Sequence, residues 1–455
     1  MTKPPSFNGR GFLRPLQLTA VIFFTVSGGP YGLEPVLQYV GGGMALMLII
    51  VTPILWSIPV IFMVLELNGM MPINGGYYQW VKTGLGLKWG FFEGWWSWLF
   101  TFTDLAIYPV LFIQYLSFFY PEVIQYKIPI CLVIIWVSAA MNLLGILPVG
   151  RSSLLLGIGV LVPFAILFGV AINKGFSFSL SGVSMQTNGL GFTVFGMGLY
   201  TVMWNFLGWD SASSFVEEVH RPVRSYLISI IAAFVLILSM YFLSIWTGTI
   251  TGIDAGVLKA QGFPSLGLQV GGWWLGAVLS FGGMASALGL FISILLAISR
   301  VPKAMADDGL LSPALSKIHP KHNVPHISII ICALVVSGMI FWEFGDLLII
   351  DVTLYGAALF LEFVALIVLR ITKPDAERPF RVPLNVAGLV AMTVLPVVCL
   401  VVALAAALSE VSIYTNATMF AIAAVATAPL AWLLLKPKSG KALLNSGDEN
   451  DSTPG

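Results

Sequence analysis

The sequence predicts an all-α membrane protein with twelve transmembrane helices, and three observations lead to this fold class. First, 58% of the 455 residues are hydrophobic and only 9% are charged, whereas a soluble globular protein carries about 25% charged residues. Second, apolar segments of about 20 residues, the length that crosses a bilayer, recur along the chain. Third, Lys and Arg are confined almost entirely to alternate connections between these segments. Together these observations exclude a cytosolic enzyme, a nucleic-acid-binding protein and a disordered scaffold.

Each of the twelve apolar segments is long enough to form a membrane-spanning helix. None shows the alternation of polar and apolar residues that a strand of a membrane β-barrel requires. The predicted spans are residues 16–39, 44–67, 91–119, 128–147, 152–172, 191–218, 226–250, 271–299, 326–342, 345–370, 384–408 and 413–435.

The distribution of Lys and Arg predicts the orientation. An even number of spans puts both termini on the same side of the membrane. That side carries nineteen Lys and Arg, and the other side carries only Lys127, Lys174 and Lys259. Because cytoplasmic loops are enriched in Lys and Arg, we expect both termini to be cytoplasmic, in a multi-pass protein of the plasma (inner) membrane.

The first span contains residues that disfavour a continuous helix. Five of the eight residues at positions 28–35 are Gly or Pro. Pro removes a backbone donor and clashes with the preceding turn, and Gly loses the most conformational entropy in a helix. We therefore expect a break near residues 27–32. Because irregular backbone inside a membrane is tolerated only where it lines a cavity or is buried in protein, the break predicts a site.

The sixth span has a weaker interruption at Asn205 and Gly208. Gly-Leu-Glu follows the first break at residues 32–34, and Gly-Trp-Asp follows the second at residues 208–210. Paired interruptions in corresponding spans indicate inverted repeats with a binding site near the middle of the membrane. The alternative is that Gly208 is only a packing position.

Four stretches resemble those of the amino acid–polyamine–organocation transporter superfamily. They are SGGPYG in span 1, ELNGMMPINGGYYQWVKTGLG after span 2, GWDSASSFVEEVHRP at span 6 and SRVPKAMADDGLLSPALSKIHPKHNVPH between spans 8 and 9. The resemblance covers nearly all of residues 14–435 and is greatest to the polyamine-uptake branch, through residues 27–34, 93–96 and 209–211. It implies a five-plus-five inverted repeat with broken helices 1 and 6, followed by two further helices. Many amino-acid carriers of the superfamily have a Gly-Ser/Gly-Ile-Gly type stretch in span 1, from which this chain departs at Pro30 and Glu34.

With this resemblance, the chain divides into four regions. Residues 1–15 form a cytoplasmic N-terminal arm. Residues 16–370 form the transporter core, with one repeat at about 16–172 and the other at about 191–370. Residues 384–435 hold two peripheral transmembrane helices, and the polar residues 436–455 are expected to form a disordered cytoplasmic tail.

Acidic residues lie within the predicted spans, whereas all twenty-two Lys and Arg lie outside them or at their edges. The acids are Glu34, Glu66, Glu93, Asp104, Asp210, Asp351 and Glu362. An ionisable group in mid-membrane costs roughly 2.5–3.5 kcal/mol on translocon scales. Without a cation of the chain, the partner of such an acid is a proton, a cationic substrate or a backbone amide.

These acids receive different expected roles. Glu34 and Asp210 follow the breaks and are expected to bind substrate, unless they only cap the helices that they start. The candidates for proton coupling are Glu66, Glu93 and Asp104. No motif supports Asp351 or Glu362.

Aromatic and backbone groups complete the predicted site. A ring face attracts an ammonium group by up to about 2 kcal/mol when water is excluded, and Trp204 borders the second break. The alternative is that such rings only pack or anchor helices at the membrane interface. The predicted substrate-binding residues are Ser27, Gly28, Gly29, Tyr31, Glu34, Tyr108, Trp204, Asn205, Gly208 and Asp210.

The first break also indicates the kind of substrate. An amino-acid carrier uses free amides at this break to hold a carboxylate. Here Pro30 lacks an amide and Glu34 adds negative charge, which favours an ammonium group instead. We expect proton-coupled uptake of a polyamine or another cationic amine by alternating access. A neutral or cationic amino acid, taken up or exchanged, is the alternative.

The connection at residues 300–325 is basic. Its Lys and Arg either form a cytoplasmic gate with nearby acids or only mark the cytoplasmic side. The basic residues are Arg300, Lys303, Lys317 and Lys321, and the nearby acids are Glu217, Glu218, Asp307 and Asp308.

No cofactor, catalytic residue or metal site is indicated. The sequence has neither a His-Glu-x-x-His nor a Gly-x-Ser-x-Gly motif, and paired breaks suit a carrier better than a channel or a membrane enzyme. The expected coupling ion is a proton, since a Na⁺ site would rest only on Ser286 and Ser293. The expected partners are the lipid bilayer and a small organic amine or amino acid, with no nucleic acid. The sequence leaves the oligomeric state open.

Overall fold

The computed structural model describes residues 12–175, 191–341, 344–408 and 415–435. Within these residues the structure is helical, and its only strand-like pairing is an isolated bridge between Leu13 and Val219. The predicted tail, residues 436–455, and most of the predicted N-terminal arm lie outside the described residues.

Every predicted span contains at least one helix. The elements are α1 (Pro15–Val26), α2 (Pro35–Thr52), η1 (Pro53–Ser57), α3 (Ile58–Met70), α4 (Gly76–Leu85), α5 (Leu87–Leu116), η2 (Pro121–Tyr126), α6 (Lys127–Leu143), α7 (Ile146–Asn173), α8 (Phe192–Trp204), η3 (Ser211–Glu218), α9 (Pro222–Ile250), α10 (Ala255–Gln261), α11 (Phe263–Gly271), α12 (Trp273–Ile298), α13 (Arg300–Asp307), η4 (Pro313–Ser316), α14 (His326–Met339), α15 (Phe344–Thr372), α16 (Val386–Leu408) and α17 (Thr415–Leu435). The short helices α4, α10, α11 and α13 lie outside the predicted spans.

Nine helical segments among the described residues are long and apolar enough to cross a membrane. Three further apolar helices are shorter, namely Pro15–Val26, Phe192–Trp204 and His326–Met339. The first two belong to the spans in which the sequence predicts a break. With this number of long apolar helices, the chain is an integral membrane protein.

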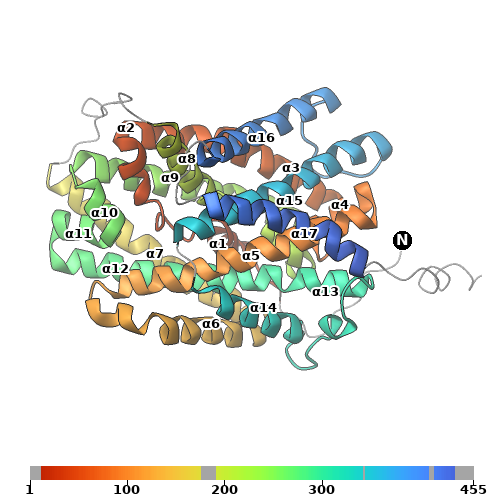
Figure 1. The fold of residues 1–455 in the computed structure, drawn as a ribbon, viewed down its shortest axis with the longest axis horizontal. Helices are drawn as coiled ribbons and strands as arrows, with labels where there is room; N and C mark the ends of the chain where they lie inside the picture. The colour runs from red at the N-terminus through yellow and green to blue at the C-terminus, as the bar shows by residue number, and fades with distance from the viewer. Residues whose placement is uncertain (1–11, 176–190, 342–343, 409–414, 436–455) are drawn as a thin grey trace, which may run out of the picture.

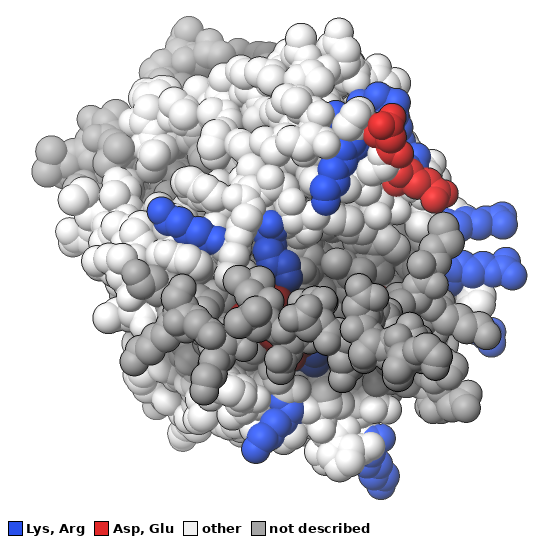
Figure 2. Space-filling model, turned by 90° about the vertical axis from the view of Figure 1, so that its right-hand side faces the viewer, with Lys and Arg blue, Asp and Glu red and all other residues white. Residues whose placement is uncertain are grey.

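The long helices lie side by side, with α4 and α13 at one end of the bundle and α10 and α11 at the other (Figure 1). Figure 2 looks onto the end with α4 and α13, where Lys and Arg side chains are seen in several places and Asp and Glu in fewer. Helix α12 is central, since 83% of its most apolar stretch is buried, against 22% for α17.

The structure confirms both predicted breaks. Helix α1 ends at Val26 and α2 begins at Pro35, and Gly28, Gly29 and Gly32 between them have positive φ angles. Helix α8 ends at Trp204, and residues 205–210 continue without regular helix into η3. A further kink at Gly41 (φ 73°) divides α2, and it lies in the predicted connection between the first two spans, residues 40–43.

The two breaks pack against each other. A Cβ at Gly208 would lie 2.2 Å from the carbonyl oxygen of Thr25, and a Cβ at Gly32 would lie 2.6 Å from the ring of Trp204. Only Gly fits at either position, because each also has a positive φ angle. The contact brings the end of α1 beside the end of α8, and this junction positions the site described below.

Candidate functional site

A small cavity, which we call the central cavity, lies where the two interrupted segments meet. Its volume is about 20 Å³, which is enough for about one water molecule. The end of α1, helices α4, α5, α12 and α15, and the segment from the end of α8 into η3 all contribute to it. It is lined by Thr25, Val26, Tyr77, Phe100, Thr101, Asp104, Tyr108, Trp204, Leu207, Gly208, Ser211, Ile294, Ala297, Ile298 and Asp351.

Asp104 is the proton-coupling candidate that lines this cavity. It lies in the middle of α5, and its Oδ1 accepts a hydrogen bond from the Tyr108 hydroxyl, one helical turn further on, at 2.5 Å. The indole N–H of Trp204 also donates to Oδ1, at 3.3 Å. The rings of Tyr108 and Trp204 are stacked, with 6.4 Å between their centroids. One carboxyl group and two aromatic rings therefore form one wall of the cavity.

Asp351, on α15, provides a second carboxyl group. It is 1% exposed, and its charge interacts with that of Asp104. Among the described residues, none donates a hydrogen bond to its Oδ1. The cavity lining contains these two acids and no Lys, Arg or His. Such an arrangement attracts a cation rather than an anion.

Asp210 and Asn205 lie beside the central cavity without lining it. Asp210 Oδ1 accepts a hydrogen bond from the Tyr355 hydroxyl at 2.7 Å, and that hydroxyl accepts one from the amide of Gly208 at 3.3 Å. The Asn205 side chain donates to the Thr201 carbonyl at 2.8 Å. These contacts hold the unwound segment in place. Asp210 is therefore one tyrosine away from the cavity wall.

Glu34 does not line the central cavity. Its Oε2 accepts a hydrogen bond from the amide of Gly32 at 2.6 Å. Its Oε1 accepts one from the Tyr115 hydroxyl at 2.9 Å and a longer one from the amide of Phe263 at 3.4 Å. Groups of the chain thus satisfy this carboxylate, although none of them is an amide of α2, so Glu34 does not cap the helix that follows it.

The other predicted residues of the first break do not line the cavity either. The Tyr31 hydroxyl donates to the carbonyl of Leu279 at 2.6 Å, and the Ser27 hydroxyl accepts from the amide of Gly29 at 3.0 Å. Gly28 packs against Leu290 and Ser286 on α12. The break contributes Thr25 and Val26 to the cavity lining instead.

Glu66 requires a correction, because it has a cationic partner within the chain. The guanidinium group of Arg370 donates to both of its carboxyl oxygens, and Nε of Arg378 lies 3.1 Å from Oε1. The amide of Val382 donates to Oε2 at 2.8 Å. The expectation of an unpaired acid is wrong at this position, and the geometry does not support a role in proton coupling. Glu93, by contrast, is fully buried and accepts a hydrogen bond only from Ser97 among the described residues.

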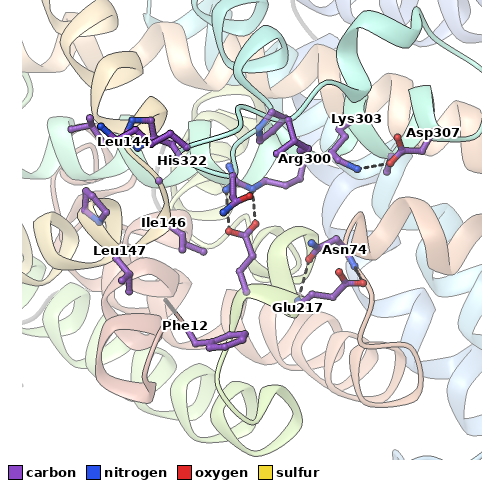
Figure 3. Close-up of a pocket in the computed structure, with 18 of the residues that line it drawn as sticks. Phe12, Asn74, Leu144, Ile146, Leu147, Glu217, Arg300, Lys303, Asp307 and His322 are labelled. Carbon is purple, nitrogen blue, oxygen red and sulfur yellow. Dashed lines mark hydrogen bonds and ion pairs between the residues drawn. The ribbon is translucent and has the colours of Figure 1, made fainter. Parts of the chain in front are cut away.

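A larger cavity of about 570 Å³ opens at the α4–α13 end (Figure 3). Arg300 at the start of α13 forms a two-pronged ion pair with Glu218, at 3.1 and 3.3 Å. Asn74 and Glu217 exchange two hydrogen bonds between their backbone amides and side chains, at 3.3 and 3.1 Å. The predicted contact of the basic connection with Glu218 is therefore present.

Several residues of the central cavity have little or no signal in the sequence. Asp351 has no motif around it. Only its position within a predicted span, without a nearby Lys or Arg, indicates a functional role. Thr25 precedes the predicted break by two residues, and Tyr77 lies in α4, which the span pattern does not predict. Of the predicted substrate-binding residues, the cavity brings together Tyr108, Trp204 and Gly208, and of the proton-coupling candidates Asp104.

Comparison with known proteins places this geometry in context. A family model described as Amino acid permease matches residues 13–425, a range that includes every residue of the central cavity. A probable polyamine transporter of Arabidopsis thaliana is 34% identical over 86% of this chain and 82% of its own length. Polyamine transporter RMV1 of the same plant is 32% identical, over 86% and 79% respectively. Polyamine transporter PUT1 of Oryza sativa subsp. japonica is 32% identical, over 88% and 74%.

Proposed function

From the premise that this chain belongs to the amino acid permease family, we propose that its substrate is a polyamine or a related cationic amine. Membership makes the chain a membrane transporter rather than an enzyme. The names of the three relatives support an amine as the substrate. Proton-coupled uptake by alternating access is the mechanism that we infer.

The observation that carries the proposal is the pairing of Asp104 and Asp351 at the central cavity. Two buried acids without a cation destabilise each other and the fold unless protons or a cationic ligand neutralise them. A polyamine supplies ammonium groups for this purpose, and the rings of Tyr108 and Trp204 favour the same charge. At about 20 Å³ the cavity is closed around less space than a diamine needs. Uptake therefore requires the cavity to widen, as alternating access demands.

The backbone of the first break supports a substrate that lacks a carboxylate. The amides of Gly28 and Leu33 donate to carbonyls of their own segment. Those of Gly29 and Gly32 donate to Ser27 and Glu34. The chain's own Glu34 carboxylate thus occupies an amide that an amino-acid carrier leaves for its substrate. This argues against the alternative, a neutral or cationic amino acid.

The membrane arrangement is part of the same proposal. Nine long helical segments and three shorter apolar helices support twelve spans. Two of the short helices, α1 and α8, end at the breaks, so each is one half of an interrupted span. Matching breaks after α1 and α8 support the five-plus-five inverted repeat. Basic side chains at the α4–α13 end (Figure 2) support a cytoplasmic location for that end and for both termini. A plasma (inner) membrane location and two peripheral helices at residues 384–435 complete the arrangement.

Uptake by proteoliposomes tests the proposal. The purified chain is reconstituted, and entry of labelled putrescine is measured with an inward proton gradient, with a protonophore, and with Na⁺ replaced by K⁺. We expect saturable uptake that spermidine inhibits, that leucine and lysine leave unchanged, and that the protonophore abolishes. Uptake of leucine with no effect of putrescine would replace the amine by an amino acid. Dependence on Na⁺ rather than on the proton gradient would replace the proton.

A further inference from the structure

Helices α5 and α15 pack against each other and carry two pairs of acids. Asp104 and Asp351 interact at the central cavity, and Glu93 and Glu362 interact with each other further along the same helices. On each helix the two acids are eleven residues apart, which is about 16 Å at 1.5 Å per residue. The second pair lies toward the α4–α13 end, since Gly94 packs against Tyr78 of α4 and Met305 of α13.

Asp210 joins the second pair, and we call Glu93, Asp210 and Glu362 the inner acidic cluster. The charge of Glu362 interacts with those of Asp210 and Glu93, and the three side chains are at most 1% exposed. In the described part of the chain, no hydrogen bond of ordinary geometry reaches Oε2 of Glu93 or either carboxyl oxygen of Glu362. The carboxyl groups of Asp210 and Glu362 are nevertheless close enough to share a hydrogen bond, which requires a proton on one of them.

The groups that interact with the cluster from the surrounding described helices include three tyrosines. Tyr77 of α4 interacts with all three acids, and Tyr226 of α9 and Tyr355 of α15 interact with Asp210 and Glu362. From α14, Cys332 interacts electrostatically with Tyr77. None of the three acids takes part in an ion pair among the described residues. The described part of the chain thus provides no ion-pair partner for them.

Building on the proposed function, we propose that the inner acidic cluster binds the coupled proton, while Asp104 and Asp351 bind an ammonium group of the substrate. A proton that forms an O–H bond on one carboxylate oxygen can be shared with a neighbouring carboxylate, and it needs no additional space. In the described chain these acids do not form a set that could hold a metal ion. They line neither the central cavity nor the larger one, whereas Asp104 and Asp351 both line the central cavity.

A short hydrogen-bonded connection links the two sites. Gly208 lines the central cavity, and its amide donates to the Tyr355 hydroxyl, which donates to Asp210. Tyr77 also lines the cavity and faces the cluster. Because Gly208 belongs to the second break, any movement of the break when substrate binds changes the contacts of Asp210. This gives the substrate a physical route to the protonation of the cluster.

Two transport assays on the reconstituted full-length chain separate the two sites. Counterflow of labelled putrescine against unlabelled putrescine, without a pH gradient, needs only the substrate site. Accumulation driven by an inward proton gradient also needs the proton site. We expect Glu362→Gln and Glu93→Gln to retain counterflow within a few-fold of the unmodified chain and to lose gradient-driven accumulation. The matched control is Glu122→Gln at an exposed acid, which should leave both assays unchanged.

Each outcome bears on a different claim. Accumulation by Glu362→Gln equal to that of the unmodified chain would place the coupled proton elsewhere. Loss of both assays in a Glu362→Gln protein that still shows a putrescine-induced thermal shift would assign the cluster to the conformational cycle and overturn the proposal. Putrescine-driven alkalinisation of the medium, read with a pH dye, should disappear in both Gln variants. Absence of counterflow in the unmodified chain would instead contradict the proposed function.

Discussion

The Cα atom of Gly208 lies so close to the carbonyl of Thr25 that a Cβ at this position would be 2.2 Å from the oxygen. Gly208 follows the end of α8, and Thr25 is two residues before the first break. The same junction brings Trp204 onto the backbone of Gly32. The two interrupted segments therefore pack closely, and Gly at positions 32 and 208 permits this contact beside the central cavity.

Gly208→Ala should disrupt this junction. The added methyl group would clash with the Thr25 carbonyl, and a residue other than Gly in the left-handed conformation costs roughly 1–2 kcal/mol by itself. We expect a lower melting temperature in detergent and loss of putrescine uptake. The matched control is Gly169→Ala on α7, where an added Cβ meets nothing within 4 Å. Equal behaviour of the two variants would argue against a tight junction at Gly208.

Trp204 should contribute to substrate affinity through its ring and its N–H group. Trp204→Ala removes a cation–ring attraction of up to about 2 kcal/mol, so KM for putrescine should rise by more than tenfold. Trp204→Phe keeps a ring but loses the hydrogen bond to Asp104, and its KM should rise less. Uptake kinetics with expression measured in parallel decide the matter. An unchanged KM in both variants would remove Trp204 from the binding site.

Glu34→Gln should act on stability rather than on substrate choice. A glutamine amide can accept with one oxygen only, so either the Gly32 amide or the Tyr115 hydroxyl loses its acceptor. A buried group left without its hydrogen bond costs about 1–3 kcal/mol. We expect a lower melting temperature and equal loss of uptake for putrescine and for a monoamine. Selective loss of the diamine would show that Glu34 contacts the substrate.

Glu66→Gln should destabilise the chain without changing the coupling to protons. Breaking one partner of a buried ion pair typically costs about 3–5 kcal/mol, and Glu66 is paired with Arg370 and Arg378. The comparison is Asp307→Asn, which breaks a more exposed pair with Lys303, worth about 0–1 kcal/mol. Thermal unfolding in detergent should separate the two variants clearly. Proton stoichiometry per putrescine should not change in Glu66→Gln; a change would restore Glu66 as a coupling residue.

The sequence predicts the positions of the breaks because Gly and Pro act on the backbone where they stand. Residues 27–32 and the Asn205–Gly208 interruption are both found as expected. The direction of the side chains that follow is a different matter. Glu34 lies two residues after Gly32. The φ angle of Gly32, +97°, turns the chain so that the Glu34 carboxylate accepts a hydrogen bond from the Gly32 amide. Such a turn depends on tertiary packing and has no signature in residue order.

Contacts between distant residues account for the other differences. Glu66 and Arg370 are 304 positions apart, and both stand at the edges of predicted spans, so only the packing of α3 beside α15 reveals their ion pair. Asp351 carries no motif, and its importance follows from lying opposite Asp104. The acids as a group were nevertheless identified from the sequence, because the cost of an ionisable group within a membrane does not depend on the details of packing.

Isothermal titration calorimetry of putrescine on the purified chain tests the central claim most directly, because it measures binding without transport or coupling. The chain should bind putrescine, and Asp104→Asn and Asp351→Asn should each weaken binding by at least about tenfold, which corresponds to roughly 1.4 kcal/mol. Butane-1,4-diol, which matches the length of putrescine without its charges, should not bind. Undiminished putrescine binding by folded Asp104→Asn and Asp351→Asn proteins would contradict the assignment of these two acids to the ammonium site.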